Sequence, residues 1–156
     1  MLSCWQFFSL TTRNDFMSEV AVELEEDSWP DFFPVGVPPK SAVPAEGEFF
    51  RLVRSNPPTP ACFLSTHEEY PQRHKKYRGE ALQCVYGTSF FSESRGATDA
   101  KAKFPAALGH RLVASGQVTP VFGVMKKTFA EPAHYTIWLK RNCAIHEHFH
   151  CIGEGV

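Results

Sequence analysis

The proline distribution is the feature that most constrains this chain of 156 residues. Five prolines lie close together before position 47: Pro30, Pro34, Pro38, Pro39 and Pro44. Proline lacks a backbone N–H and fixes φ near about −65°, so neither an α-helix nor a central β-strand is expected here. We expect an extended arm whose aromatic residues Trp29, Phe32 and Phe33 either pack on the following domain or form an exposed partner site.

The chain before this proline-rich segment also reads as nonglobular. Met17 opens a more ordinary protein start than the Cys-, Trp- and Phe-rich residues 1–16, which are either an upstream extension of the reading frame or an interaction segment. Residues 19–27 carry a run of acidic side chains, typical of a solvated stretch. We therefore expect a nonglobular arm over residues 1–46 and one folded domain over residues 47–156.

Composition limits the classes of partner. The chain is 43% hydrophobic and 13% aromatic, which is enough for one packed core. Its 16 basic and 17 acidic residues give a formal charge of −1, so no global field attracts nucleic acid or an anionic membrane. No segment approaches the roughly 20 apolar residues of a membrane span, and no secretory signal is evident. We expect a cytoplasmic protein with no membrane or nucleic-acid partner.

The five cysteines are widely scattered and contain no CxxC pair. Reduced thiols in a cytosolic protein are the simpler interpretation. Cys62 and Cys84 have apolar sequence neighbours, so we expect core side chains and no nucleophilic cysteine.

Strand-like segments dominate the domain. They are residues 47–55, 81–91, 118–129, 133–140 and 143–152. A polar connection spans residues 61–80, and alanine spacing predicts a helix around residues 97–108 that breaks at Pro105. This order predicts an α+β domain with a mainly antiparallel sheet and one or two helices.

The last strand-like segment carries the main candidate for chemistry. Strand alternation places Glu147 on the apolar face with Ile145 and Phe149. A buried carboxylate needs a cation, a hydrogen bond or a cleft, so Glu147 is either functional or part of a wet edge strand. The opposite face carries His146, His148 and His150, but no further ligand occurs at a recognisable spacing, and we predict no metal.

Two other segments offer ligand-binding groups. Arg51 lies within an apolar strand, where an enclosed guanidinium suits either a phosphate or carboxylate ligand or an ion pair with Glu147. Thr88 and Ser89 follow Gly87 at the end of a predicted strand before a helix, as in a modest anion or ribose site.

A further pair opens the segment 133–140. His134 and Tyr135 offer an imidazole and an aromatic face for stacking on a flat ring, and core packing is the alternative for Tyr135.

Two stretches carry a resemblance. The run from Pro38 to Ser65, which contains EGEFFRLVRSNPPTP, and the series YGTSFF…HYTIW from Tyr86 to Trp138 resemble small, mostly uncharacterised bacterial proteins of mobile or prophage-like regions. This resemblance implies a shared fold but no mechanism. It also fits a noncatalytic protein that binds a host or cognate protein through its aromatic, proline-rich arm.

The chain also resembles ADP-ribosyltransferase-like domains. Arg51, then Thr88 or Ser89 before an alanine-containing helix, then Glu147, follow the order of that pattern. The resemblance implies NAD as substrate, with the pyrophosphate near Arg51, the nicotinamide ribose near Ser89, and His134 and Tyr135 against the ring. It implies that Glu147 stabilises the positive charge that develops as nicotinamide leaves. The sequence departs from the Glu/Gln-x-Glu pattern because position 145 is Ile145, which argues against arginine as the acceptor.

Overall fold

The computed structural model describes residues 29–153. The expected extension 1–16 and the acidic run 19–27 lie outside these residues. The compact unit that contains the sheet begins at Phe32. Residues 32–46, which the sequence analysis assigned to the arm, therefore belong to this unit, and Ala45 is fully buried in its core.

The described residues form short helices and seven strands. The α-helices are α2 (Thr66–Glu69), α3 (Gly79–Val85), α4 (Ser94–Lys103) and α5 (Pro105–Leu108). The 3₁₀ helices are η1 (Pro60–Phe63), η2 (Arg73–Lys76), η3 (Pro120–Phe122) and η4 (Ile145–His148). The strands are β1 (Val43–Pro44), β2 (Gly47–Val53), β3 (Thr88–Phe91), β4 (Leu112–Val118), β5 (Gly123–Lys127), β6 (His134–Leu139) and β7 (Phe149–Cys151).

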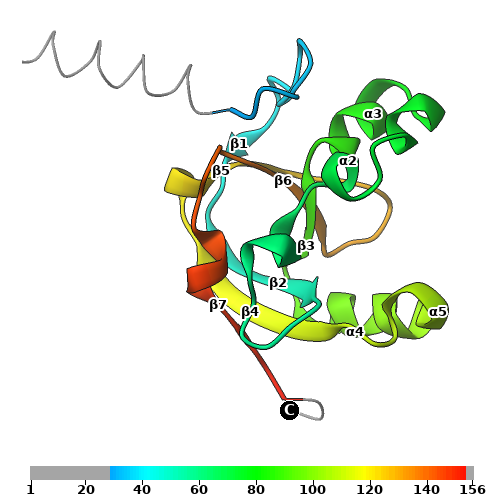
Figure 1. Ribbon diagram of the computed structural model, residues 1–156, viewed down its shortest axis with the longest axis vertical. Helices are drawn as coiled ribbons and strands as arrows, with labels where there is room; N and C mark the ends of the chain where they lie inside the picture. Colours follow the sequence, from blue (N-terminus) through cyan, green and yellow to red (C-terminus); the bar gives the residue numbers. More distant parts are fainter. Residues whose placement is uncertain (1–28, 154–156) are drawn as a thin grey trace, which may run out of the picture. The chain divides into compact units, whose positions relative to one another are not determined.

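The strands form one antiparallel sheet in the order β1-β5-β6-β3-β2-β4-β7. Figure 1 shows α2 and α3 beside one end of β3, and α4 and α5 beside the other. The α+β class with a mainly antiparallel sheet is confirmed, although four short α-helices occur among residues 29–153 where one or two were expected.

The two faces of β2 have different partners. Phe49 and Val53 belong to the larger apolar cluster, together with Phe90 of β3 and Ile137 of β6. Leu52, on the opposite face, packs with the smaller cluster around α4. By the same alternation, Arg51 places its guanidinium on the face of the larger cluster.

Three predicted strands are wrong in part. The expected strand 118–129 is interrupted by η3, because Pro120 lacks an N–H, and β5 begins only at Gly123. Residues 81–85 belong to α3, because Ala81, Leu82 and Gln83 are good helix formers and only Val85 is β-branched. The expected strand 143–152 begins as η4, where the N–H of Glu147 donates to the carbonyl of Ala144 at 3.1 Å instead of to a neighbouring strand.

The segment around Pro105 follows the prediction. α4 ends at Lys103, and Pro105 occupies the first turn of α5. The N–H groups of a first turn have no acceptor within the helix, so the missing N–H of proline costs no hydrogen bond there. Strand β4 was not predicted.

Within residues 29–153, no helix has the length and apolar character that crossing a bilayer requires.

Candidate functional site

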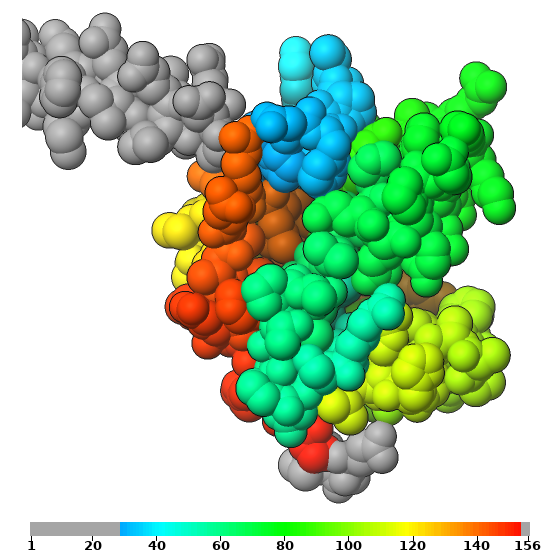
Figure 2. Space-filling view, viewed as in Figure 1, coloured from blue at the N-terminus to red at the C-terminus, as the bar shows by residue number. Residues whose placement is uncertain are grey.

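A cavity of about 650 Å³ opens beside the middle of the sheet. Its lining comes from β2, β3, the α2–η2 segment, α4, α5 and the loop before β6. Figure 2 shows a hollow between the green surface of the α2–α3 region and the yellow-green surface of α4 and α5. A cavity of this size suits a nucleotide-sized ligand.

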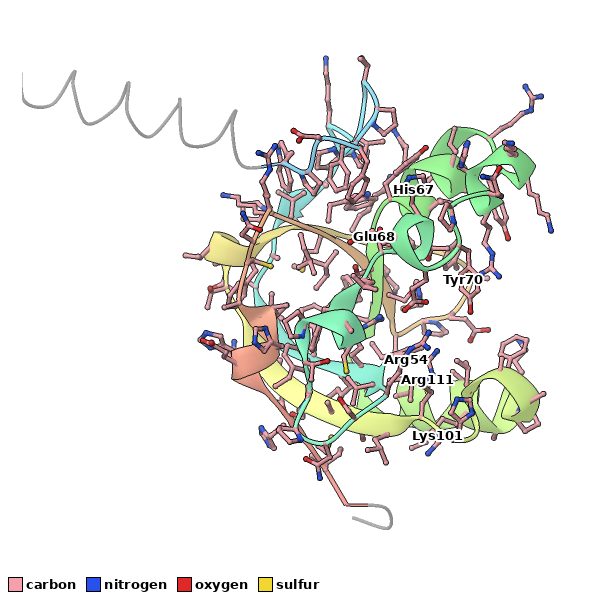
Figure 3. The ribbon with its side chains drawn as sticks, in the orientation of Figure 1. Arg54, His67, Glu68, Tyr70, Lys101 and Arg111 are labelled. Atoms are coloured by element: carbon pink, nitrogen blue, oxygen red, sulfur yellow. The ribbon has the colours of Figure 1, made fainter. Side chains whose placement is uncertain are left out.

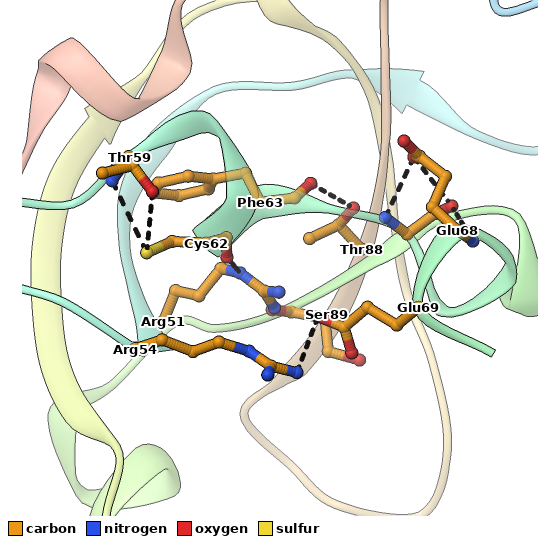
Figure 4. Close-up of polar contacts among 10 residues, drawn as sticks. Arg51, Arg54, Thr59, Cys62, Phe63, Glu68, Glu69, Thr88 and Ser89 are labelled. Atoms are coloured by element: carbon orange, nitrogen blue, oxygen red, sulfur yellow. Dashed lines mark hydrogen bonds and ion pairs between the residues drawn. The ribbon is translucent and has the colours of Figure 1, made fainter.

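Arg51 lies at this cavity and is 8% exposed. Its Nε donates to the carbonyl of Cys62 at 2.7 Å, and its Nη1 donates to the carbonyl of Ser89 at 2.7 Å (Figure 4). The guanidinium carbon also lies 5.8 Å from the ring centre of Phe63 and 5.6 Å from that of Phe90. These contacts fix the orientation of a planar, charged group at the end of an apolar core.

The charge of Arg51 is not neutralised by a direct ion pair with any residue between 29 and 153. Burial lowers the pKa of Arg51 to about 10, which still leaves the side chain protonated at neutral pH. Its two hydrogen bonds, to the carbonyls of Cys62 and Ser89, are to neutral groups and use two of its five N–H donors. A buried cation in this state is stabilised by an anionic ligand.

Arg111 brings a second guanidinium to the same cavity, just before β4. Its Nε is buried and has no hydrogen-bond partner in the described structure. Burial is the main cause of the lowered pKa of Arg51; the charge of Glu69 opposes it, and the charge of Arg111 adds a smaller lowering. An anion held by both arginines would satisfy the unpaired donor of Arg111.

Glu69 supplies a carboxylate close to these cations. It lines the cavity and forms an ion pair with Arg54 at 3.6 Å, and Figure 3 labels Arg54 and Arg111 among the side chains of this region. The carboxylate opposes the lowering of the pKa of Arg51. The first turn of α2 is held by Ser65, whose Oγ accepts from the N–H of Glu68 at 3.2 Å.

The side chains of Thr88 and Ser89 lie on opposite faces of β3. Ser89 lines the cavity and its carbonyl accepts from Arg51, whereas Thr88 is buried on the other face of β3 and donates to the carbonyl of Phe63 at 3.2 Å. Both residues begin β3, and α4 starts only at Ser94, so their expected position at a strand end directly before a helix is wrong.

The side chains of His134 and Tyr135 also point to opposite faces of the sheet, because the two residues are neighbours on one strand. His134 lines the cavity, and its Nδ1 lies 2.9 Å from the Oγ1 of Thr128. Burial lowers the pKa of His134. Tyr135 packs edge-on against Phe49 at 5.3 Å between ring centres, which is the core alternative left open by the sequence.

Glu147 is exposed on η4 and does not line the cavity. The strand alternation that placed it on an apolar face is wrong, because the 3₁₀ turn directs it to solvent. Glu147 and Arg51 are therefore not brought together, and the expected alternative ion pair between them is absent from the described residues. Across residues 29–153, no group of three or more His, Cys, Asp or Glu side chains is arranged to hold a metal ion.

Cys62 lies directly behind Arg51. It is buried, as expected for a core cysteine, but its Sγ lies 3.5 Å from the Oγ of Ser55 and accepts from the N–H of Thr59 at 3.5 Å. Burial raises the pKa of the Cys62 thiol, yet the hydrogen bonds outweigh that effect and the pKa falls to about 6. This property does not follow from its apolar sequence neighbours.

Sequence reasoning missed Glu69 and Arg111. The capping signature from Ser65 to Glu68 predicts a helix start and would have placed Glu69 on α2. No local signal marks Arg111, whose position depends on the pairing of β4 with β2. Comparison of the chain with protein-family models, curated proteins and solved structures found no match.

Proposed function

We propose that the cavity binds NAD and that the protein is an ADP-ribosyltransferase-like enzyme acting on a macromolecular target. One observation carries the proposal. Arg51 and Arg111 are two guanidinium groups at one cavity; the first is buried without a direct ion pair among the described residues, and the second has a buried, unpartnered Nε. A pyrophosphate is the ligand group that best matches this pair.

The surroundings support a dinucleotide over a simple phosphate. The cavity volume of about 650 Å³ exceeds what a phosphate fills, and its lining includes the aromatic rings of Tyr70, Phe91 and Phe104. Aromatic faces accept a base or a nicotinamide ring. Ser89 and His134, which the resemblance assigned to the ligand, both line the cavity.

Glu69 replaces Glu147 in the proposed mechanism. In the reaction, the bond between C1′ of the ribose and the nicotinamide nitrogen breaks, and its electron pair leaves with nicotinamide. The positive charge on the ribose is stabilised by the carboxylate of Glu69. The acceptor oxygen or nitrogen then supplies an electron pair to C1′ and loses its proton to solvent or to Glu69.

The test uses the full chain. NAD binding is followed by calorimetry, and nicotinamide release is followed by chromatography. We expect binding with slow release, and release lost in Glu69→Gln but retained in the matched control Glu147→Gln. Absence of binding at about millimolar NAD would refute the proposal, and binding without release of nicotinamide would refute its catalytic part.

The competing function is a noncatalytic interaction protein that uses the aromatic arm. Phe33 packs edge-on against Tyr86 at 6.4 Å, and Phe32 lies 5.4 Å from the ring of His67. Both rings contact their own compact unit, although Phe32 is still 36% exposed. The packing of Phe33 supports the enzyme over the arm as a partner site.

A further inference from the structure

A basic surface segment begins at the cavity with Tyr70 and Arg73. This strip consists of Arg73, Lys75, Lys76 and Arg78 with the flanking tyrosines Tyr70 and Tyr77. All four cations are exposed, although the chain as a whole has a charge of −1.

The carboxylates nearest in sequence do not neutralise the strip. Glu68 is bonded to the N–H and hydroxyl of Ser65, Glu69 pairs with Arg54 at 3.6 Å, and Glu80 pairs with Lys126 at 3.6 Å. None of the four strip cations has an ion pair with a residue in the described part of the chain. The strip therefore presents concentrated positive charge to solvent.

The two tyrosines make this surface more specific than a solvated charge run. Tyr70 is 45% exposed and Tyr77 is 42% exposed. The guanidinium carbon of Arg73 lies 4.1 Å from the ring centre of Tyr70, so a cation and an aromatic ring are stacked at the surface. Surfaces that bind single-stranded nucleic acids combine backbone-tracking cations with aromatic rings on which bases stack.

We propose that this strip binds single-stranded nucleic acid. The net charge of the chain predicts no nucleic-acid partner. The strip nevertheless provides a local cluster of exposed cations and aromatic rings, which net charge does not report. Tyr70 and Arg73 also line the cavity, so a bound strand would reach its mouth. The strand would then be the acceptor of ADP-ribose; this role rests on the proposed function, whereas binding to the strip does not.

The experiment is fluorescence anisotropy of the full chain with a labelled oligothymidylate of about 12 nucleotides, at about 50 mM salt. We expect binding that weakens with salt, and a loss of at least about tenfold in Lys75→Glu/Lys76→Glu. The matched control is Lys40→Glu/Lys140→Glu, which makes the same charge change outside the strip and should bind normally. Thermal unfolding confirms that both variants remain folded.

A second variant separates stacking from charge. Tyr77→Leu keeps every cation and should weaken oligothymidylate binding about tenfold, because one base loses its aromatic platform. Equal effects of the two double variants would overturn the proposal, as would unchanged binding by Tyr77→Leu. Displacement of the strand by polyglutamate at equal charge concentration would instead indicate an acidic protein partner. Pyrophosphate calorimetry on the same samples tests the cavity separately, so the two proposals fail independently.

Discussion

Replacing Arg111 by methionine should change stability and ligand binding in opposite directions. The Nε of Arg111 is buried without a partner, and its charge repels that of Arg51. An unsatisfied buried donor costs about 1–3 kcal/mol, so an apolar side chain of similar length should raise the free energy of unfolding by about 1 kcal/mol. Methionine keeps the apolar packing of the arginine stem.

The same substitution should weaken pyrophosphate binding. Hydrogen bonds to a charged partner contribute about 1.5–3 kcal/mol, which corresponds to a loss of about 10- to 150-fold in affinity. Urea unfolding measures the first effect and calorimetry with pyrophosphate and ADP-ribose measures the second. Lys140→Met is the control, because it removes a cation that does not line the cavity and should leave affinity unchanged. A stability loss above about 2 kcal/mol in Arg111→Met, or unchanged affinity, would refute the reasoning.

Three other substitutions test the site and the fold. Glu69→Gln should abolish nicotinamide release while lowering stability by no more than about 1 kcal/mol, because its ion pair involves the half-exposed Arg54; release at the wild-type rate would remove Glu69 from the mechanism. The lowered pKa of His134 makes neutral His134 the stabilising form, so this contribution is complete above about pH 6.5 and is lost as pH falls through the folded pKa. Urea unfolding between about pH 7 and 5 should show a smaller pH-dependent loss in His134→Gln than in the wild type, and equal slopes would contradict this. Gly123→Ala should lower stability by about 2 kcal/mol or more, since φ is +152° and a Cβ would lie 2.0 Å from the carbonyl oxygen of Trp138; a neutral result in thermal unfolding would argue against this β5–β6 register.

The sequence predicted those parts of the fold that depend on local pattern. The strands around Phe49 and Ile137 and the break at Pro105 follow from β-propensity and from the missing N–H of proline. The class of fold follows from their order. Enclosure of Arg51 was also predictable, because apolar neighbours on both sides place a charged side chain within a buried strand.

The composition of the site was less predictable because it depends on tertiary contacts. Glu147 fails as a cavity residue because a 3₁₀ turn replaces the assumed alternation. Thr88 and Tyr135 do not line the cavity, because adjacent strand residues point to opposite faces and Ser89 and His134 take the side that faces it. Arg51 starts from the face of Phe49, and its long side chain reaches the cavity and the carbonyl of Ser89. Arg111 comes to the same cavity as Arg51 only through long-range pairing of β2 with β4, which no local pattern encodes.

The most direct test follows the arginine Nε–H signals of the full chain by NMR while ADP-ribose is added. Arg111→Met assigns one signal, and that of Arg51 is identified by Arg51→Lys. We predict saturable shifts of both signals, with the larger change at Arg111, because its Nε gains a first partner while that of Arg51 is already held by the carbonyl of Cys62. Shifts confined to residues 73–78, or no shift at about millimolar ADP-ribose, would contradict a pyrophosphate site between the two guanidinium groups.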